Sequence, residues 1–99
     1  MSYSTRTDTL IMQAIRGVKR HRIGSAKTRH NHIKEARRFV NTIRDLGYGV
    51  QRWRNISNKH VHEAVDRWKD EGLQVATIKE YLSGVRYVCR IYGNDRIAP

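Results

Sequence analysis

The sequence contains a single proline, Pro99, and it is the last residue. Proline interrupts helices because it lacks a backbone N–H and its ring clashes with the preceding turn. The rest of the chain is therefore free of this break. Strict alternation of apolar and polar residues is rare, whereas apolar residues recur at intervals of three and four. These patterns predict an all-α protein whose helices are joined by short loops.

Four segments have this amphipathic pattern, and together they contain nearly every apolar residue. They cover about residues 7–20, 25–46, 57–71 and 76–93. Ser25 is a good N-cap for the second segment and Gly47 stands where a C-cap is wanted. Thr77 and Glu80 have the spacing of a capping box, although the last helix could begin a turn earlier.

Ninety-nine residues suit one domain, and four helices that share their apolar faces form a compact bundle. We therefore expect a single four-helix bundle over residues 7–93, a flexible tail over 1–6 and the start of a linker over 94–99. A chain this short buries too little surface to enclose a deep catalytic cavity.

The net charge points to the class of partner. Lys and Arg number 20 against 9 Asp and Glu, a formal charge of +11, and 14 of the 20 cations are arginines. An excess of this size on a small domain indicates a polyanion, and the planar guanidinium group pairs with phosphate oxygens and guanine edges. The alternative is a basic protein whose charge serves only solubility.

Catalytic and metal sites find little support. The pairs His30/His32 and His60/His62 are two residues apart, which on a helix separates the side chains by about 200°. No glycine-rich phosphate loop or Gly-x-Ser-x-Gly motif occurs. We expect no metal, no cofactor and no small-molecule substrate. Cys89 falls among the apolar positions of the last segment, which predicts a buried thiol.

No apolar run approaches the roughly 20 residues of a membrane-spanning helix. We therefore expect no membrane partner and a cytoplasmic protein, associated with the nucleoid when it binds DNA.

The first candidate binding surface is the basic start of the second segment. Its apolar positions begin only at Ile33, and the same side continues toward the N-terminus with polar and basic residues. A helix end of this kind can direct side chains and free backbone N–H groups at phosphates. The candidates are Arg22, Lys27, Thr28, Arg29 and His32. A solvated helix end is the alternative.

The second candidate is a basic stripe on the last segment, formed by Lys79, Ser83, Arg86 and Arg90. These positions share a narrow arc beside the apolar face, and no acid lies among them. Neutralisation of phosphates would stabilise such a row of cations, although a solvated face remains open. The third segment is acidic on its outer side (Glu63, Asp66, Asp70), so we expect that side to lie away from DNA.

Three aromatic residues have competing interpretations. Trp53, between Arg52 and Arg54, either stacks on a base or fills the edge of the core, and we favour the core. Tyr87, next to the basic stripe, suits a phosphate contact and a rim position equally well. Trp68 is spaced with apolar residues and belongs to the core.

The quoted segments resemble a known family. LQVATIKEYLSGVRYVCRIYG (73–93) is similar to the segment that closes the N-terminal core-binding (SAM-like) domain of tyrosine recombinases, the phage integrases, with its Thr-Ile, Leu-Ser and apolar-Arg pairs. VHEAVDRWKDEGL (61–73) resembles that domain's third helix and Gly-Leu turn, and SAKTRHNHIKEARRFVNTIRDLG (25–47) its second helix. The resemblance covers about residues 8–93.

The resemblance implies a helical clamp on one face of a recombination half-site of double-stranded DNA. By position it implies DNA contacts from Lys27, Thr28, Arg29, His32, Thr77, Lys79, Ser83, Arg86 and Arg90. A separate C-terminal domain cuts DNA in this family, and its His-x-x-Arg element does not occur here. We therefore expect a non-catalytic part of a longer integrase, which meets other protomers on DNA through the full-length protein. The alternative is a helical accessory module, excisionase-like or binding protein or RNA.

Overall fold

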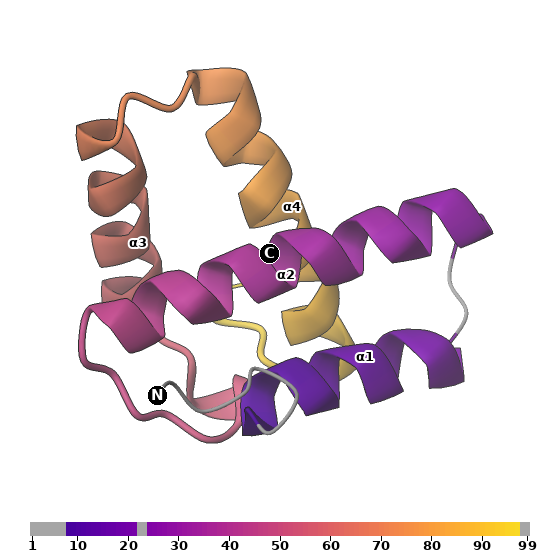
Figure 1. Ribbon diagram of the computed structural model, residues 1–99. Coiled ribbons are helices and arrows are strands. Elements are labelled where there is room, and N and C mark those ends of the chain that lie inside the picture. Colours follow the sequence, from indigo (N-terminus) through magenta and orange to yellow (C-terminus); the bar gives the residue numbers. More distant parts are fainter. Residues whose placement is uncertain (1–7, 22–23, 98–99) are drawn as a thin grey trace.

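The computed structural model describes residues 8–21 and 24–97. It contains four α-helices and one short 3-10 turn, in the order α1 (Thr9–His21), α2 (Ala26–Asp45), η2 (Trp53–Asn55), α3 (Asn58–Asp70) and α4 (Val75–Ile91). The helices α1 and α2 lie across the pair formed by α3 and α4 (Figure 1). No strand occurs within the described ranges. The predicted all-α four-helix bundle is confirmed.

The ends of the helices follow local sequence signals, with one exception. Ser25 caps α2, because its side chain accepts a hydrogen bond from the backbone N–H of Thr28, and Gly47 follows the end of α2 with a φ of 97°. The exception is α4, which begins at Val75 after the N-cap Gln74. Thr77 therefore lies inside the first turn and does not cap the helix.

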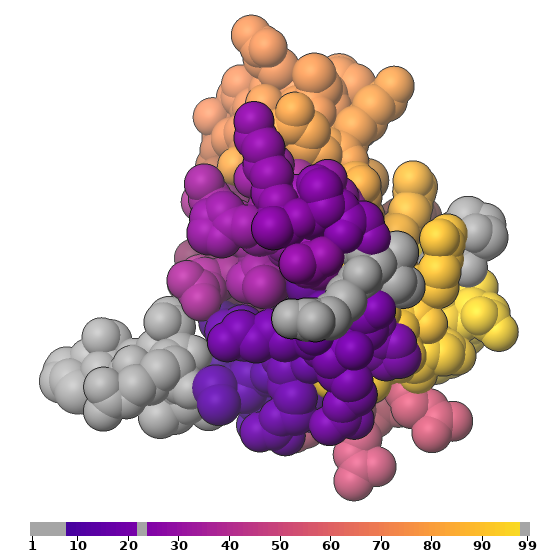
Figure 2. All heavy atoms as spheres, turned by 90° about the vertical axis from the view of Figure 1, so that its right-hand side faces the viewer, coloured from indigo at the N-terminus to yellow at the C-terminus, as the bar shows by residue number. Residues whose placement is uncertain are grey.

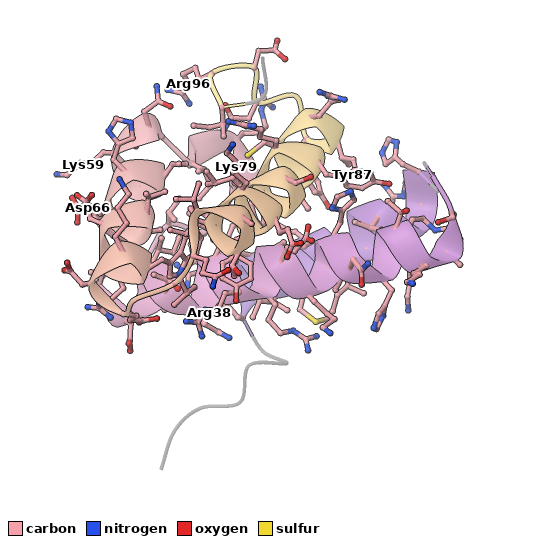
Figure 3. All side chains as sticks on the ribbon, turned by 90° about the horizontal axis from the view of Figure 1, so that it is seen from above. Arg38, Lys59, Asp66, Lys79, Tyr87 and Arg96 are labelled. Atoms are coloured by element: carbon pink, nitrogen blue, oxygen red, sulfur yellow. The ribbon has the colours of Figure 1, made fainter. Side chains whose placement is uncertain are left out.

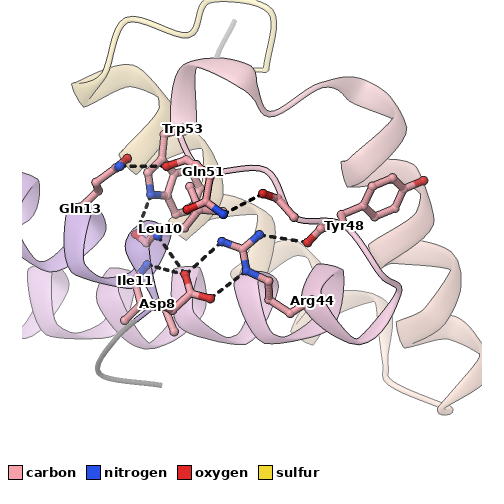
Figure 4. A network of polar contacts seen from close by, with 9 residues as sticks. Asp8, Leu10, Ile11, Gln13, Arg44, Tyr48, Gln51 and Trp53 are labelled. Carbon is pink, nitrogen blue, oxygen red and sulfur yellow. Dashed lines mark hydrogen bonds and ion pairs between the residues drawn. The ribbon is translucent and has the colours of Figure 1, made fainter. Parts of the chain in front are cut away.

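The start of α1 is fixed to the end of α2 by one carboxylate (Figure 4). Oδ1 of Asp8 accepts hydrogen bonds from the backbone N–H groups of Leu10 and Ile11, while Oδ2 accepts from Nε of Arg44 at 2.8 Å. Burial alone would raise the pKa of Asp8, but the hydrogen bonds from Arg44 and the two backbone groups together hold this pKa below its ordinary value. Asp8 therefore serves both as helix cap and as tie between two helices.

Two tryptophans organise the core. The indole N–H of Trp53 donates to the carbonyl oxygen of Leu10 at 2.8 Å, and that of Trp68 donates to Oγ1 of Thr42 at 2.9 Å. Both side chains are fully buried. The core interpretation of Trp53 is thus confirmed, and base stacking by this residue is excluded. Cys89 is buried as predicted, and burial raises the pKa of its thiol to about 12.

The packed domain continues past residue 93. Asn94 is buried and its side-chain amide donates to the carbonyl oxygens of Trp53 and Ile56, both at 2.8 Å. Ile97 is only 7% exposed. The segment after α4 therefore closes the core beside η2. The predicted tail over 1–6, and residues 98–99 of the predicted linker, lie outside the described residues.

Candidate nucleic-acid interface

The first turn of α2 is held in place by several of the predicted DNA-contacting residues. Oγ of Ser25 donates to Oγ1 of Thr28 at 2.9 Å, and Nη1 of Arg29 donates to the carbonyl oxygen of Gly24 at 2.6 Å. Lys27 and Thr28 are exposed, and Arg29 is half-buried. This helix end is therefore a preformed cationic surface. Arg22, predicted for the same surface, lies outside the described residues.

His32 occupies a fixed position between α2 and α4. Its Nδ1 lies 2.8 Å from Oε1 of Glu35, and its ring lies against that of Tyr87 with 4.4 Å between centroids. Figure 3 shows Tyr87 on the side of α4 that faces α2. The rim position proposed for Tyr87 agrees with this contact, and a phosphate contact of Tyr87 stays a prediction.

A glycine brings the two helices together at this point. A Cβ atom on Gly84 would meet Cβ of Glu35, Oε1 of Glu35 at 2.8 Å and the carbonyl oxygen of His32 at 2.9 Å. Ordinary van der Waals separations are about half an ångström or more longer. Only glycine therefore allows α4 to cross α2 at this distance, and the residues on either side of Gly84 are carried to the rim of α2.

The two predicted surfaces meet at this crossing. His32 of α2 and four residues of α4 (Ser83, Arg86, Tyr87, Arg90) line one shallow hollow of about 260 Å³, which we call the α2–α4 hollow. Ser83, Arg86 and Arg90 are exposed, and within the described ranges neither arginine has an ion pair. A polar groove that carries two free guanidinium groups fits a phosphate backbone.

Other predicted residues lie outside the hollow. Lys79 is exposed on α4 one turn before Ser83, and Thr77 is half-buried in the first turn of that helix. Lys27, Thr28 and Arg29 lie before His32 along α2 and do not line the hollow. The predicted residues therefore form a surface along both helices, and the hollow lies where they cross.

The comparisons with known proteins agree with this geometry. The family model described as "Phage integrase, N-terminal" matches residues 4–98. The chain belongs to the phage integrase N-terminal family. Neither a curated protein nor a solved structure matches it at a significant level. The family connects the chain with DNA integration and recombination, as a module related to tyrosine recombinases.

In this integrase domain one acid of α3 adjoins the basic stripe of α4. Asp66 of α3 and Arg86 of α4 line the same groove of about 500 Å³ between the two helices. Glu63 is engaged elsewhere, because it accepts a hydrogen bond from the hydroxyl group of Tyr48 at 2.5 Å, which raises the pKa of Tyr48. The expectation that the acidic side of α3 lies away from DNA stays a prediction. The helices α3 and α4 make few backbone contacts, and the groove lies between them.

The ion pairs of the integrase domain are concentrated on α2. The described part of the chain has four, and each includes a residue of α2: Asp8–Arg44, His32–Glu35, Arg38–Glu71 and Asp45–Arg67. The cations of α1, α4 and η2 have no such partner among the residues described. The ion pairs thus offset charge on α2, and the cations on these three elements are not offset in this way.

The sequence interpretation did not identify the contact between Gly84 of α4 and Glu35 of α2. Gly84 interrupts the apolar pattern of α4 between Leu82 and Val85, which is the one available signal of a close helix approach. Glu35 is the first acid after a long basic stretch, and its position one turn after His32 is the signal for their pair.

Neither a metal-binding cluster nor a membrane-spanning helix occurs within the described residues. No group of three His, Cys, Asp or Glu side chains is placed to hold a metal ion. None of the described helices has both the length and the apolar character needed to cross a bilayer.

Proposed function

We propose that this chain is the DNA-binding module of a site-specific tyrosine recombinase, and that it grips a half-site of double-stranded DNA through α2 and α4. The observation that carries the proposal is the α2–α4 hollow, where a histidine of α2 meets two arginines of α4 that have no ion pair among the described residues. When such cations bind phosphates, no free energy is spent on breaking an existing ion pair.

The contacts are mainly with phosphates, from Lys27, Thr28, Arg29, His32, Thr77, Lys79, Ser83, Arg86 and Arg90. The exposed first turn of α2 additionally suits a few base edges in the major groove. Cutting and rejoining belong to a separate catalytic domain, and this chain is not itself an enzyme. The full-length protein would act in the cytoplasm, where it would meet other protomers on the DNA.

The test compares two double variants that remove equal charge. Arg86→Ala/Arg90→Ala alters the hollow, whereas Lys34→Ala/Arg37→Ala removes two exposed cations of α2 that do not line it. Affinity for a duplex is measured by fluorescence anisotropy between 50 and 200 mM salt. Each lost phosphate contact flattens the plot of log K against log salt by about 0.9 and weakens binding about eightfold at 0.1 M salt. Equal losses in both variants would refute the assignment of the α2–α4 face.

The groove between α3 and α4 supports a second candidate. Five of its lining residues are apolar (Val61, Val65, Leu82, Val85 and Ile97), which fits a protein partner and therefore an accessory or interaction module. The salt dependence separates the two functions. Binding of DNA through five or more phosphates gives a slope of about −4 or steeper, whereas an apolar protein contact changes little with salt.

A further inference from the structure

A second arginine-lined hollow lies away from the α2–α4 hollow. Four arginines line it: Arg16, Arg20, Arg52 and Arg54. With Gln13, Trp53 and Tyr92 they enclose a shallow space of about 330 Å³, and no acid is part of its wall. We call these four residues the arginine cluster. Arg16 and Arg20 belong to α1, Arg52 is the N-cap of η2 and Arg54 lies within η2, more than 30 residues farther along the chain.

The guanidinium groups of the arginine cluster have no ion-pair or hydrogen-bond partner among the described residues. All four side chains are exposed, and none makes an ion pair or side-chain hydrogen bond with another residue of the described ranges. This contrasts with Arg38, Arg44 and Arg67, which each bind an acid. Four neighbouring cations repel one another in the free protein, and an anion placed between them reverses the sign of that energy.

The backbone that carries two of these arginines is rigid. Trp53, between Arg52 and Arg54, is fully buried, and its carbonyl oxygen accepts from the side chain of Asn94. The backbone N–H of Asn55 donates to the carbonyl oxygen of Arg52 at 2.9 Å. Because Trp53 points into the core, its two neighbours along the turn are both exposed. Their placement is therefore fixed before any ligand arrives, which lowers the entropic cost of binding.

The other wall of the hollow is tied to this turn. Nε2 of Gln13 donates to the carbonyl oxygen of Gln51 at 2.9 Å, and the hydroxyl group of Tyr92 donates to the carbonyl oxygen of Gln13 at 2.6 Å. A fifth cation joins the group, because Nη2 of Arg96 donates to the carbonyl oxygen of Arg54 at 2.9 Å. Side-chain hydrogen bonds thus hold α1, the turn and the end of α4 in one arrangement.

The two hollows are close enough for a single duplex. Both hollows adjoin the C-terminal end of α4, which contributes Arg90 to the first and its C-cap residue Tyr92 to the second. Figure 2 shows atoms of α1, of the start of α2, of the end of α4 and of the η2 region on the same side of the molecule. The domain extends 33 Å in its longest direction, which is about one helical turn of B-form DNA.

We propose that the arginine cluster is a second phosphate-binding site, which takes the backbone of the same DNA duplex that α2 and α4 hold. This inference rests on the proposed DNA-binding function and extends its footprint to α1 and η2. A phosphodiester suits the site better than a protein carboxylate, since four guanidinium groups from two elements can bind several oxygens of adjacent phosphates along a continuous backbone.

The experiment uses the variant Arg52→Ala/Arg54→Ala, with Lys34→Ala/Arg37→Ala as the charge-matched control. Wild-type and variant chains are titrated with a 20-base-pair duplex across a series of salt concentrations. We expect the cluster variant to flatten the log–log salt slope by about 1 to 2 and to weaken binding at least fivefold at 0.1 M salt. The control should change neither quantity beyond the small effect of net charge.

A second measurement separates failure of this inference from failure of the proposed function. Arginine side-chain N–H signals are followed by NMR in Arg86→Ala/Arg90→Ala, with duplex DNA and with poly-glutamate as probes. Shifts of Arg52 and Arg54 on DNA addition support the second site. If the cluster variant binds like the control while Arg86→Ala/Arg90→Ala binds weakly, the cluster is not a DNA site and the proposed function stands. Tighter binding of poly-glutamate than of DNA at the cluster would overturn the inference in favour of an acidic protein partner.

Discussion

Substitution of Gly84 by alanine tests the helix crossing that brings the two parts of the α2–α4 hollow together. The added methyl group would meet Cβ of Glu35 and the carbonyl oxygen of His32, the latter at 2.9 Å. Both atoms are held by the backbone of α2, so a rotamer change cannot remove the clash. The helices have to separate by about half an ångström or more.

The expected cost follows from two opposing effects. Overpacking of a well-packed site costs about 1–3 kcal/mol, and the rigid neighbours favour the upper end. Alanine recovers about 1 kcal/mol through its higher helix propensity. The free energy of unfolding should therefore fall by about 2 kcal/mol. For a domain of this size, that corresponds to a melting temperature lower by about 10 °C.

Two other glycines provide a graded control in the same assay. A Cβ on Gly49 would meet nothing within 4 Å, and one on Gly17 would meet only side-chain atoms of Tyr92 and Ile91 at 3.0–3.1 Å. Urea denaturation should show Gly49→Ala near wild type, Gly17→Ala slightly changed and Gly84→Ala clearly destabilised. If Gly84→Ala were as stable as Gly49→Ala, the close approach of α4 to α2 would be refuted. Duplex binding below the melting transition should weaken in Gly84→Ala alone, because the rim residues of α4 move relative to His32.

Three further predictions concern single side chains. Asp8→Ala should lower the free energy of unfolding by about 3 kcal/mol, since it removes a helix cap and leaves Arg44 without its partner. The pKa of Asp8 in the folded protein lies below its ordinary 3.8, so its contribution to stability is complete above pH 3.8. The contribution is lost as the pH falls through the folded-state pKa. Urea midpoints between pH 2 and 7 measure this loss. Burial lowers the pKa of His60 below 6.5, and its Nδ1 accepts a hydrogen bond from the backbone N–H of Ser57. The free energy of unfolding should therefore decline as the pH falls from 6.5 toward the folded-state pKa of His60. The same decline in His60→Ala would contradict this. Cys89 should react with a thiol reagent only as fast as the domain opens, because the thiol is buried and its pKa is raised to about 12; rapid modification of the native protein would show that the core is open there.

The sequence predicts the helices well because their signals are local. The apolar intervals identify all four, and Ser25 and Gly47 act at the ends of α2 as their chemistry indicates. The start of α4 is three residues earlier than the capping-box pattern suggests, since Gln74 and not Thr77 is the N-cap. A cap pattern of side chains is a weak signal when the helix can add another turn.

The site was predicted only in part, because its geometry depends on which helices touch. The basic stripe was identified from one helix, but its meeting with His32 depends on the crossing at Gly84. The shared groove of Asp66 and Arg86 likewise depends on how α3 and α4 are placed by their packing against α2. The arginine cluster joins Arg16 to Arg52 across 36 positions of the chain, and no periodicity within one segment reports such a contact.

The concentration of ion pairs on α2 has a consequence for the free protein. With four of the nine acids engaged there, the cations on the other elements repel one another, and this repulsion acts against the fold whenever no anion is near. Any polyanion, whatever its sequence, relieves the repulsion and raises the melting temperature by mass action. Heparin should therefore protect the domain from heat, as we also expect of duplex DNA. Thermal protection reports the charge of a ligand, and recognition of a particular DNA sequence has to be measured by competition between duplexes.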